Sequence, residues 1–289
     1  MNLRFKKVSK LKTRKFVSSL FKWLVLILIM FFLLFPIYWV ILTAFKTNME
    51  SYQYPPTFIP QAPTLEGFIN LFTNYPEFFI YYKNNIIVAT LSTLMVCSAA
   101  LFSGYALSRV RINWNKYVIA FLLFSQMFPV VSRLISLYGL LRNWGLLNTT
   151  AGLVLSIAAG QLPFSITLLA SFFDGVPRDL EEAAYIDGSG RFKTMFKVVM
   201  PLVVSGLLAV GIYSFLVAWD DYLYASTLIQ NDALRTLSTG VTLRYLGELS
   251  YDWSLVNSIS VVGTLPMVFV FFFFQKYMIK GLTAGAVKG

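Results

Sequence analysis

The sequence predicts an all-α integral membrane protein with six transmembrane helices. Of its 289 residues, 57% are hydrophobic and only 13% are charged, whereas about 25% of the residues in a soluble domain carry charge. The mean hydropathy is +0.67. Long stretches without Asp, Glu, Lys or Arg also recur along the chain. In lipid every backbone polar group needs a partner within the protein, so these stretches are expected to be helices.

Five of these stretches have the length of about 20 residues that a helix needs to cross a bilayer. They are residues 23–45, 84–108, 143–173 (a short loop followed by a span), 198–219 and 253–275. A sixth span, at about 117–137, contains Arg133 near one end. We expect this arginine to snorkel to the membrane surface; the alternative is that it lines a cavity.

The distribution of basic residues predicts the orientation. Residues 1–22 contain eight Lys and Arg and no acidic residue, and the apolar run that follows is too long for the core of a signal peptide, so we expect a retained first helix. With six spans, both termini lie on one side, and 18 of the 24 Lys and Arg fall on that side. The positive-inside rule makes it the cytoplasm. The net charge of +11 then reflects topology and not nucleic-acid binding.

The chain has one cysteine, Cys97, and no histidine. This composition excludes a disulfide framework and histidine-based catalysis, and it argues against a zinc site. We therefore expect neither catalytic residues nor a metal site.

Residues 174–200, between the fourth and fifth spans, are predicted to form two short helices at the cytoplasmic surface. Pro177 suits the first position of the first helix, whose first turn contains three carboxylates favoured by the helix dipole, and Gly188 suits its end. Ser189 is expected to cap a second, basic helix that leads into the fifth span at Pro201. The three carboxylates are Asp179, Glu181 and Glu182.

Two interpretations of this segment remain open from the residues alone. Ala183 and Ala184 would let another surface approach closely, and the carboxylates could pair with a partner's arginine, which describes a docking element. Alternatively, the segment is a solvated loop whose charges only maintain the topology.

The spacing within this segment resembles the EAA loop of ABC importer permeases. Glu182-Ala183-Ala184 is followed after three residues by Gly188 and after nine more by residues 198–201, where Val and Met stand in place of the family's Ile and Leu. Residues 126–149, 171–190, 218–225 and 275–289 resemble the maltose-type, MalG-like branch of sugar importers. The resemblance implies a type I importer (MetI-like) permease fold.

The resemblance also implies how the chain is organised and what it assembles with. A basic cytoplasmic tail (residues 1–22) would precede a permease domain (23–279) containing the coupling loop (174–200), and a cytoplasmic tail (280–289) would follow. The implied partners are a second homologous permease, two copies of a cytoplasmic ATPase and an external sugar-binding protein, in a bacterial cytoplasmic membrane. ATP and Mg would bind to the ATPase, since residues 188–194 place Phe192 where a phosphate loop needs glycine.

Three sets of residues are candidates for a role in this assembly. By resemblance, the first set would contact the ATPase and the second would add a C-terminal contact, unless the C-terminal tail is simply frayed. The third set would lie on the solute path, unless it is an ordinary interfacial charge pair, and Asp220 replaces the Asn that the family usually has there. The first set, for the ATPase contact, is Glu181, Glu182, Ala183, Ala184, Asp187 and Gly188. The second set, for the C-terminal contact, is Gly281, Thr283 and Gly285. The third set, for the solute path, is Asp220 and Asp221.

Three other functions compete with the sugar importer. A secondary transporter driven by an ion gradient would have ionisable groups near mid-membrane and often repeat symmetry, and we find neither pattern in the sequence. A non-transport scaffold would not require the coupling motif. An ABC permease for a solute other than sugar would share the mechanism.

Overall fold

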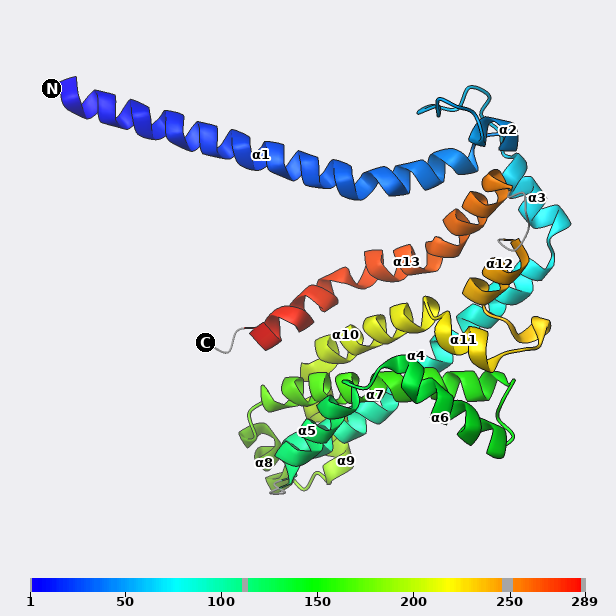
Figure 1. The fold of residues 1–289 in the computed structure, drawn as a ribbon. Helices are drawn as coiled ribbons and strands as arrows, with labels where there is room; N and C mark the ends of the chain where they lie inside the picture. The colour runs from blue at the N-terminus through cyan, green and yellow to red at the C-terminus, as the bar shows by residue number, and fades with distance from the viewer. Residues whose placement is uncertain (1, 111–113, 246–251, 287–289) are drawn as a thin grey trace. The chain divides into compact units, whose positions relative to one another are not determined.

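The computed structural model describes residues 2–110, 114–245 and 252–286, and the side chains of residues 19–110, 114–245 and 252–276. Every regular element among these residues is a helix (Figure 1). The chain forms two compact units, Met1–Asn74 with Ser250–Val262 and Tyr75–Leu249 with Gly263–Gly289. We describe each unit by itself.

The first unit contains a long helix, two short helices and the beginning of the last helix. These are α1 (Asn2–Ala44), α2 (Asn48–Ser51), α3 (Glu66–Asn74) and the first part of α13 (Trp253–Ala286). Gly67 allows α3 to approach α13 closely, because a Cβ there would lie 2.5 Å from the hydroxyl of Ser254.

The proline-rich segment between α1 and α3 is folded around two buried charges. The Lys46 side chain lies over the ring of Trp39 and donates a hydrogen bond of 2.6 Å to the carbonyl of Thr57. The Glu50 carboxylate accepts hydrogen bonds from the Thr57 hydroxyl and from the backbone of Gln61, at 2.7 and 2.9 Å. The hydrogen bond from Thr57 holds the pKa of Glu50 below its usual value. A segment without long helices thus has a defined structure.

The second unit holds the remaining elements. They are α4 (Glu77–Arg109), α5 (Asn115–Ser125), α6 (Val130–Asn143), α7 (Thr150–Asp174), α8 (Asp179–Ile186), α9 (Arg191–Thr194), the π-helical turn η1 (Met195–Val199), α10 (Met200–Trp219), α11 (Leu223–Leu228), the 3-10 turn η2 (Asp232–Leu234), α12 (Leu237–Tyr245) and the rest of α13.

The core of the second unit lies where α4, α7 and α10 pack together. Val96 and Ala100 of α4, Leu169 of α7, and Val203 and Val210 of α10 are buried in one apolar cluster. Small residues set the helix spacing: a Cβ at Gly104 would lie 3.1 Å from the backbone nitrogen of Ala170, and a Cβ at Gly206 would lie 2.4 Å from the ring of Phe172.

Five helical runs are long and apolar enough to cross a membrane, and they agree with the five spans expected from the sequence. They are Ser19–Ala44, Glu77–Arg109, Thr150–Asp174, Arg191–Trp219 and Trp253–Lys276. The basic segment before the first span is not a separate element, because α1 begins at Asn2 and continues through it.

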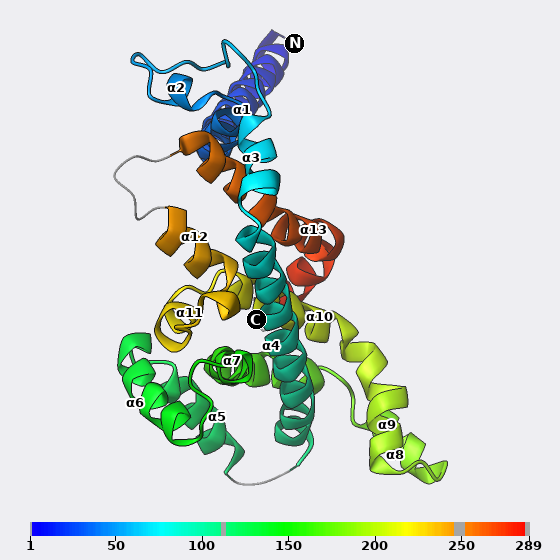
Figure 2. The same cartoon turned by 90° about the vertical axis from the view of Figure 1, so that its right-hand side faces the viewer.

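The helix expected to span about 117–137 is divided into two. This region consists of α5 and α6, which are bent by 96° at a short break and count as a sixth span only if the pair crosses as one (Figure 2). The cause is Pro129, which lacks an N–H and disfavours helical geometry at the preceding residue. Pro129 is instead the N-cap of α6, with ψ at 134°. Arg133 lies in α6 with its Nε enclosed.

Replacing Gly206 with alanine should lower the free energy of unfolding by about 1–3 kcal/mol, because the added methyl would overlap the ring of Phe172. Gly139→Ala is the matched control, since Gly139 is also helical and a Cβ there meets nothing within 4 Å. The control should be neutral or stabilising, because alanine favours helix over glycine. Thermal unfolding of both variants in detergent measures the difference, and equal effects would contradict the packing of α10 on α7.

Candidate functional site

Helix α8 forms largely as its sequence predicts. Asp179, Glu181 and Glu182 lie in its first turn, where the dipole of the helix favours negative charge. The helix begins after Arg178, so Pro177 lies just before it and not at its first position. It ends at Ile186, and Gly188, two residues later, adopts φ = +78°, a left-handed conformation that glycine adopts without strain.

The expectation that Ser189 caps the second short helix is wrong. The backbone N–H of Ser189 bonds to the carbonyl of Ala184 at 2.9 Å and so belongs to the end of α8. Gly190 is therefore the N-cap of α9, and no side chain caps that helix. Helix α9 then continues through η1 into α10, with Pro201 near the start of α10 as expected.

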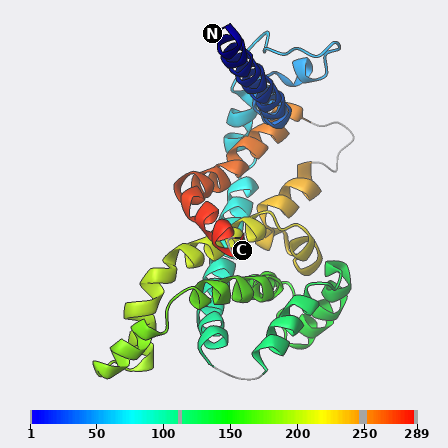
Figure 3. The ribbon, with the colours of Figure 1, turned by 90° about the vertical axis from the view of Figure 1, so that its left-hand side faces the viewer.

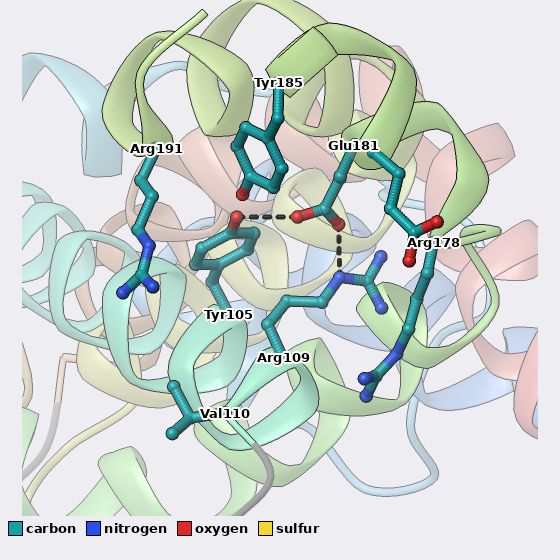
Figure 4. A pocket seen from close by; sticks show the side chains of 8 residues that line it. Tyr105, Arg109, Val110, Arg178, Glu181, Tyr185 and Arg191 are labelled. Carbon is teal, nitrogen blue, oxygen red and sulfur yellow. Dashed lines mark hydrogen bonds and ion pairs between the residues drawn. The ribbon is translucent and has the colours of Figure 1, made fainter.

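Glu181 points away from solvent, toward the end of α4, and only 5% of the residue is exposed. One carboxylate oxygen accepts a hydrogen bond of 2.8 Å from the hydroxyl of Tyr105, and the other is ion-paired with Arg109 Nε (Figure 4). The side chain of Arg109 is 10% exposed. Removing one partner of such a buried pair costs about 3–5 kcal/mol, because the remaining charge is left without compensation.

Further hydrogen bonds hold the same end of α4 to the chain that precedes α8. The Ser108 hydroxyl donates to the Asp174 carboxylate at 2.6 Å, and Arg109 donates to the carbonyl of Val176 at 3.0 Å. Arg178 in turn donates to the carbonyl of Ser108 at 2.9 Å. The last turn of α4 is thus fixed to α8 and to the connection between α7 and α8.

The other residues of the predicted coupling set are more exposed than Glu181. Glu182, Ala183, Asp187 and Gly188 are exposed and Ala184 is half-buried. Ile186 lies beside them with 86% of its surface exposed. The structure therefore brings the set onto one short helix but separates Glu181 from the rest.

A hollow of about 400 Å³ lies between α8 and the end of α4. Its lining is mostly charged and aromatic, and Arg178 and Arg191 stand on opposite sides of it (Figure 4). The lining residues are Tyr105, Arg109, Val110, Arg178, Glu181, Glu182, Tyr185 and Arg191. Within the described residues, no group of three or more His, Cys, Asp or Glu could hold a metal ion.

The two aspartates predicted near the solute path differ in their surroundings. The carboxylate of Asp221 accepts hydrogen bonds from the backbone N–H groups of Ala225 and Tyr224, at 2.9 and 3.4 Å, so it caps α11. Burial raises the pKa of Asp221 to about 6. Asp220 ends α10 and is exposed. Only Asp220 therefore presents its carboxylate freely to the surroundings.

The C-terminal candidates lie near the end of the last helix. Gly281, Thr283 and Gly285 lie within the backbone of α13, and the side chains of this part of the helix are outside the described residues.

The polar contacts that α4 makes at its ends were not predicted from the sequence. At the end of α4 near Glu77, the carboxylate of Glu77 pairs with Arg244 at 2.6 Å, and the hydroxyl of Tyr81 bonds to the carboxylate of Asp232 at 2.9 Å. A sequence signal existed, because Glu77, Tyr81 and Asn85 repeat at four-residue spacing and so share one helix face.

The arrangement of the helices defines a class of protein. The fold is that of a MetI-like ABC importer permease: it matches, with a TM-score of 0.80, a chain in the crystal structure of a bacterial ABC transporter involved in the import of the acidic polysaccharide alginate. The match covers 90% of this chain and 96% of that chain, at 20% sequence identity.

Sequence comparison then shows the family. Residues 15–283 match the family described as "Binding-protein-dependent transport system inner membrane component", and the chain belongs to it. The chain is 37% identical over 256 residues to the sulfoquinovosyl glycerol transport system permease protein SmoH of Agrobacterium fabrum, covering 89% of each protein. It is 33% identical over 257 residues to the trehalose/maltose transport system permease protein MalG of Thermococcus litoralis, covering 89% of this chain and 92% of the relative.

Replacing Gly188 with alanine should destabilise the end of α8 by about 1–2 kcal/mol, because a side chain disfavours the left-handed conformation. Gly190→Ala is the matched control: both sites are open, but Gly190 has φ = −74°. Hydrogen exchange of the backbone amides in α8 measures local opening. Faster exchange in Gly188→Ala alone is expected, whereas faster exchange in both variants would show that any side chain in this turn disturbs α8.

Proposed function

We propose that this chain is the permease subunit of an ATP-driven importer of carbohydrates, that it forms half of the translocation pathway, and that α8 couples it to a separate ATPase. The observation that carries the proposal is the two-sided nature of α8. One face is fixed to the permease through Glu181, and the other presents Glu182 and small residues to solvent. A helix held in this way suits the transfer of force between two proteins.

The proposed orientation places α8 and both termini in the cytoplasm of a bacterium, with the chain crossing the cell membrane several times. The excess of Lys and Arg on that side supports it. Residues 1–22 and 280–289 would then be cytoplasmic tails flanking the permease domain at 23–279.

The contact with the ATPase would combine charge and close fit. Glu182 would pair with an arginine of the ATPase, since a carboxylate and a guanidinium form strong, charge-assisted hydrogen bonds. Ala183, Ala184 and Gly188 would allow close approach, and Ile186 would supply apolar area at the same surface. Asp187 would add a second charge. Gly281, Thr283 and Gly285 would form a further contact at the C-terminal end.

The proposed complex contains four kinds of protein besides the lipid around it. A second homologous permease would complete the pathway, two ATPase copies would bind ATP and Mg, and an external binding protein would deliver the solute. Support comes from the family, which consists of components of binding-protein-dependent systems.

Carbohydrate is the proposed class of solute because two relatives and a matched solved structure are named for carbohydrates. SmoH is named for a sulfosugar glycoside, MalG for trehalose and maltose, and the matched solved structure for alginate. An ABC permease for another solute would share the fold and the coupling site, so uptake measured with a panel of labelled oligosaccharides and amino acids distinguishes the two.

The coupling role is tested by purifying the tagged chain from its native membrane in mild detergent and identifying the proteins that accompany it. We expect a second permease and an ATPase, and we expect Glu182→Lys to lose the ATPase, because truncating or reversing one partner of an interfacial charge pair costs about 2–5 kcal/mol. Glu66→Lys is the control, since Glu66 is also exposed in the first turn of a helix.

Recovery of the chain alone, under conditions that preserve a known ABC complex, would instead favour a carrier driven by an ion gradient or a scaffold. Loss of the ATPase in both lysine variants would mean that charge reversal only destabilises the chain.

The proposed solute path now rests on Asp220, whose carboxylate is exposed, and not on Asp221, which caps α11. Asp220→Asn should raise the KM for uptake about tenfold, because a charged acceptor for sugar hydroxyls is lost. Asp221→Asn is the comparison, since asparagine caps helices as well as aspartate does and should leave the KM unchanged. An unchanged KM in Asp220→Asn would remove this residue from the path.

A further inference from the structure

We infer that Glu181 is a positioning residue that holds α8 on the end of α4, so that α4 carries the movement of α8 to residues 219–245 at its other end. The inference rests on the coupling function proposed above and adds to it the route through this chain. It also assigns different roles to two adjacent glutamates. Glu182 would contact the ATPase, whereas Glu181 acts within the permease.

The near end of the route is the buried group around Glu181. The side chain of Glu181 is 6% exposed, and both carboxylate oxygens are bonded, one to Tyr105 and one to Arg109. Tyr105 in turn packs edge-on against the ring of Phe173 in α7, with 5.4 Å between the ring centres. A carboxylate enclosed in this way cannot also reach a protein that docks on the exposed face of α8.

Helix α4 is suited to carry movement because it is unbroken. It has 33 residues, which corresponds to about 50 Å. The other long helices contain interruptions that permit bending: Pro36 in α1, Pro163 in α7 and Pro266 in α13. The run Arg191–Trp219 contains the π-helical turn η1. Helix α4 contains neither a proline nor a π-helical turn.

The far end of the route is a second group of contacts, from the opposite end of α4 to residues 219–245. The backbone of residues 219–245 is yellow to gold in Figure 3, and that of α4 is cyan to teal. This group contains the ion pair of Glu77 with Arg244 and the hydrogen bond of Tyr81 with Asp232. The amide side chains of two asparagines make further hydrogen bonds at the same end of the helix. Asn84 donates to the carbonyls of Ala233 and Arg235, each at 2.9 Å, and Asn85 donates to the carbonyl of Trp219 at 3.1 Å.

Tight packing accompanies these polar contacts. A Cβ at Gly240 would lie 2.2 Å from the ring of Tyr81, so α12 rests directly on α4. Because polar contacts fix each end of one unbroken helix, buried around Glu181 and more exposed around Glu77, a displacement at α8 is transmitted to α12. Without the Glu181 contacts, α4 would be held only to the chain that precedes α8, through Ser108, Arg109 and Arg178. Helix α8 itself would then be coupled less firmly to α4.

The test uses the whole importer, reconstituted in lipid from the proteins that accompany this chain. For each variant we measure capture of the ATPase, basal ATP hydrolysis, its stimulation by the loaded binding protein, and uptake. Glu181→Ala should retain the ATPase, whereas the stimulation of hydrolysis and the uptake fall about tenfold, within the usual range of coupling between distant sites. Glu182→Ala is the matched control, because the same change on the exposed face should weaken capture of the ATPase itself.

Exchange of the two charges separates positioning from a direct contact. Arg109→Glu and Glu181→Arg should each lose stimulation, and the double variant should regain it, because the ion pair is restored within the chain. If Glu181 instead contacted the ATPase, Glu181→Ala would lose the ATPase and the exchange would rescue nothing, and either result would overturn the inference. Failure of the unaltered chain to capture any ATPase would overturn the coupling function.

A distance measurement tests the rigid link even if a substitution at Glu181 reduces the amount of folded protein. Spin labels are attached at Ile80→Cys in α4 and Leu180→Cys in α8, both exposed and neither in the proposed ATPase contact, with Cys97 replaced by alanine. The distance should be narrow and identical in the nucleotide-free and nucleotide-trapped states. Tyr105→Phe, which removes one hydroxyl from the anchor, should broaden it. A distance that differs between the two states of the otherwise unaltered chain would overturn the inference.

Discussion

The second unit depends on α4, a long helix that packs in the core and makes polar contacts with other elements at both ends. Its middle is buried with α7 and α10 around Val96 and Ala100, where small residues let the helices approach closely. Its ends carry the charged and hydroxyl groups that an apolar core would exclude, and these reach α8 at one end and α12 at the other. The apolar middle supplies stability, and the polar ends fix the orientation of the elements around it.

The adjacent glutamates of α8 show how one helix serves two surfaces. Successive residues of a helix point about 100° apart, so Glu181 and Glu182 leave α8 in different directions. The structure buries the first against Tyr105 and Arg109 and leaves the second in solvent. The sequence does not distinguish the two glutamates. In the structure Glu181 makes contacts within the chain, whereas the carboxylate of Glu182 is exposed. The same distinction applies to Asp220 and Asp221, of which only the second caps a helix.

Most of the helices could be predicted because their causes are local. Five apolar stretches became five long helices, since backbone groups in lipid have to be paired within the segment. Gly188 ends α8 as expected, because only glycine adopts its left-handed conformation without strain. The failures have local causes as well. Pro129 interrupts the region expected to be continuous, and Ser189 is already used in ending α8, so it cannot cap the next helix.

By itself, the sequence determined that the chain is helical, that it has the apolar runs of a membrane protein, and that an E-A-A segment followed by Gly188 lies between two spans. These properties follow from composition and spacing along the chain. Only the tertiary structure decided which carboxylate is buried, how the ends of α4 are fixed, and that α5 and α6 are sharply bent. The partners of Glu181 lie more than 70 residues away in the sequence, and no local pattern specifies which side chain will meet an acid at that distance.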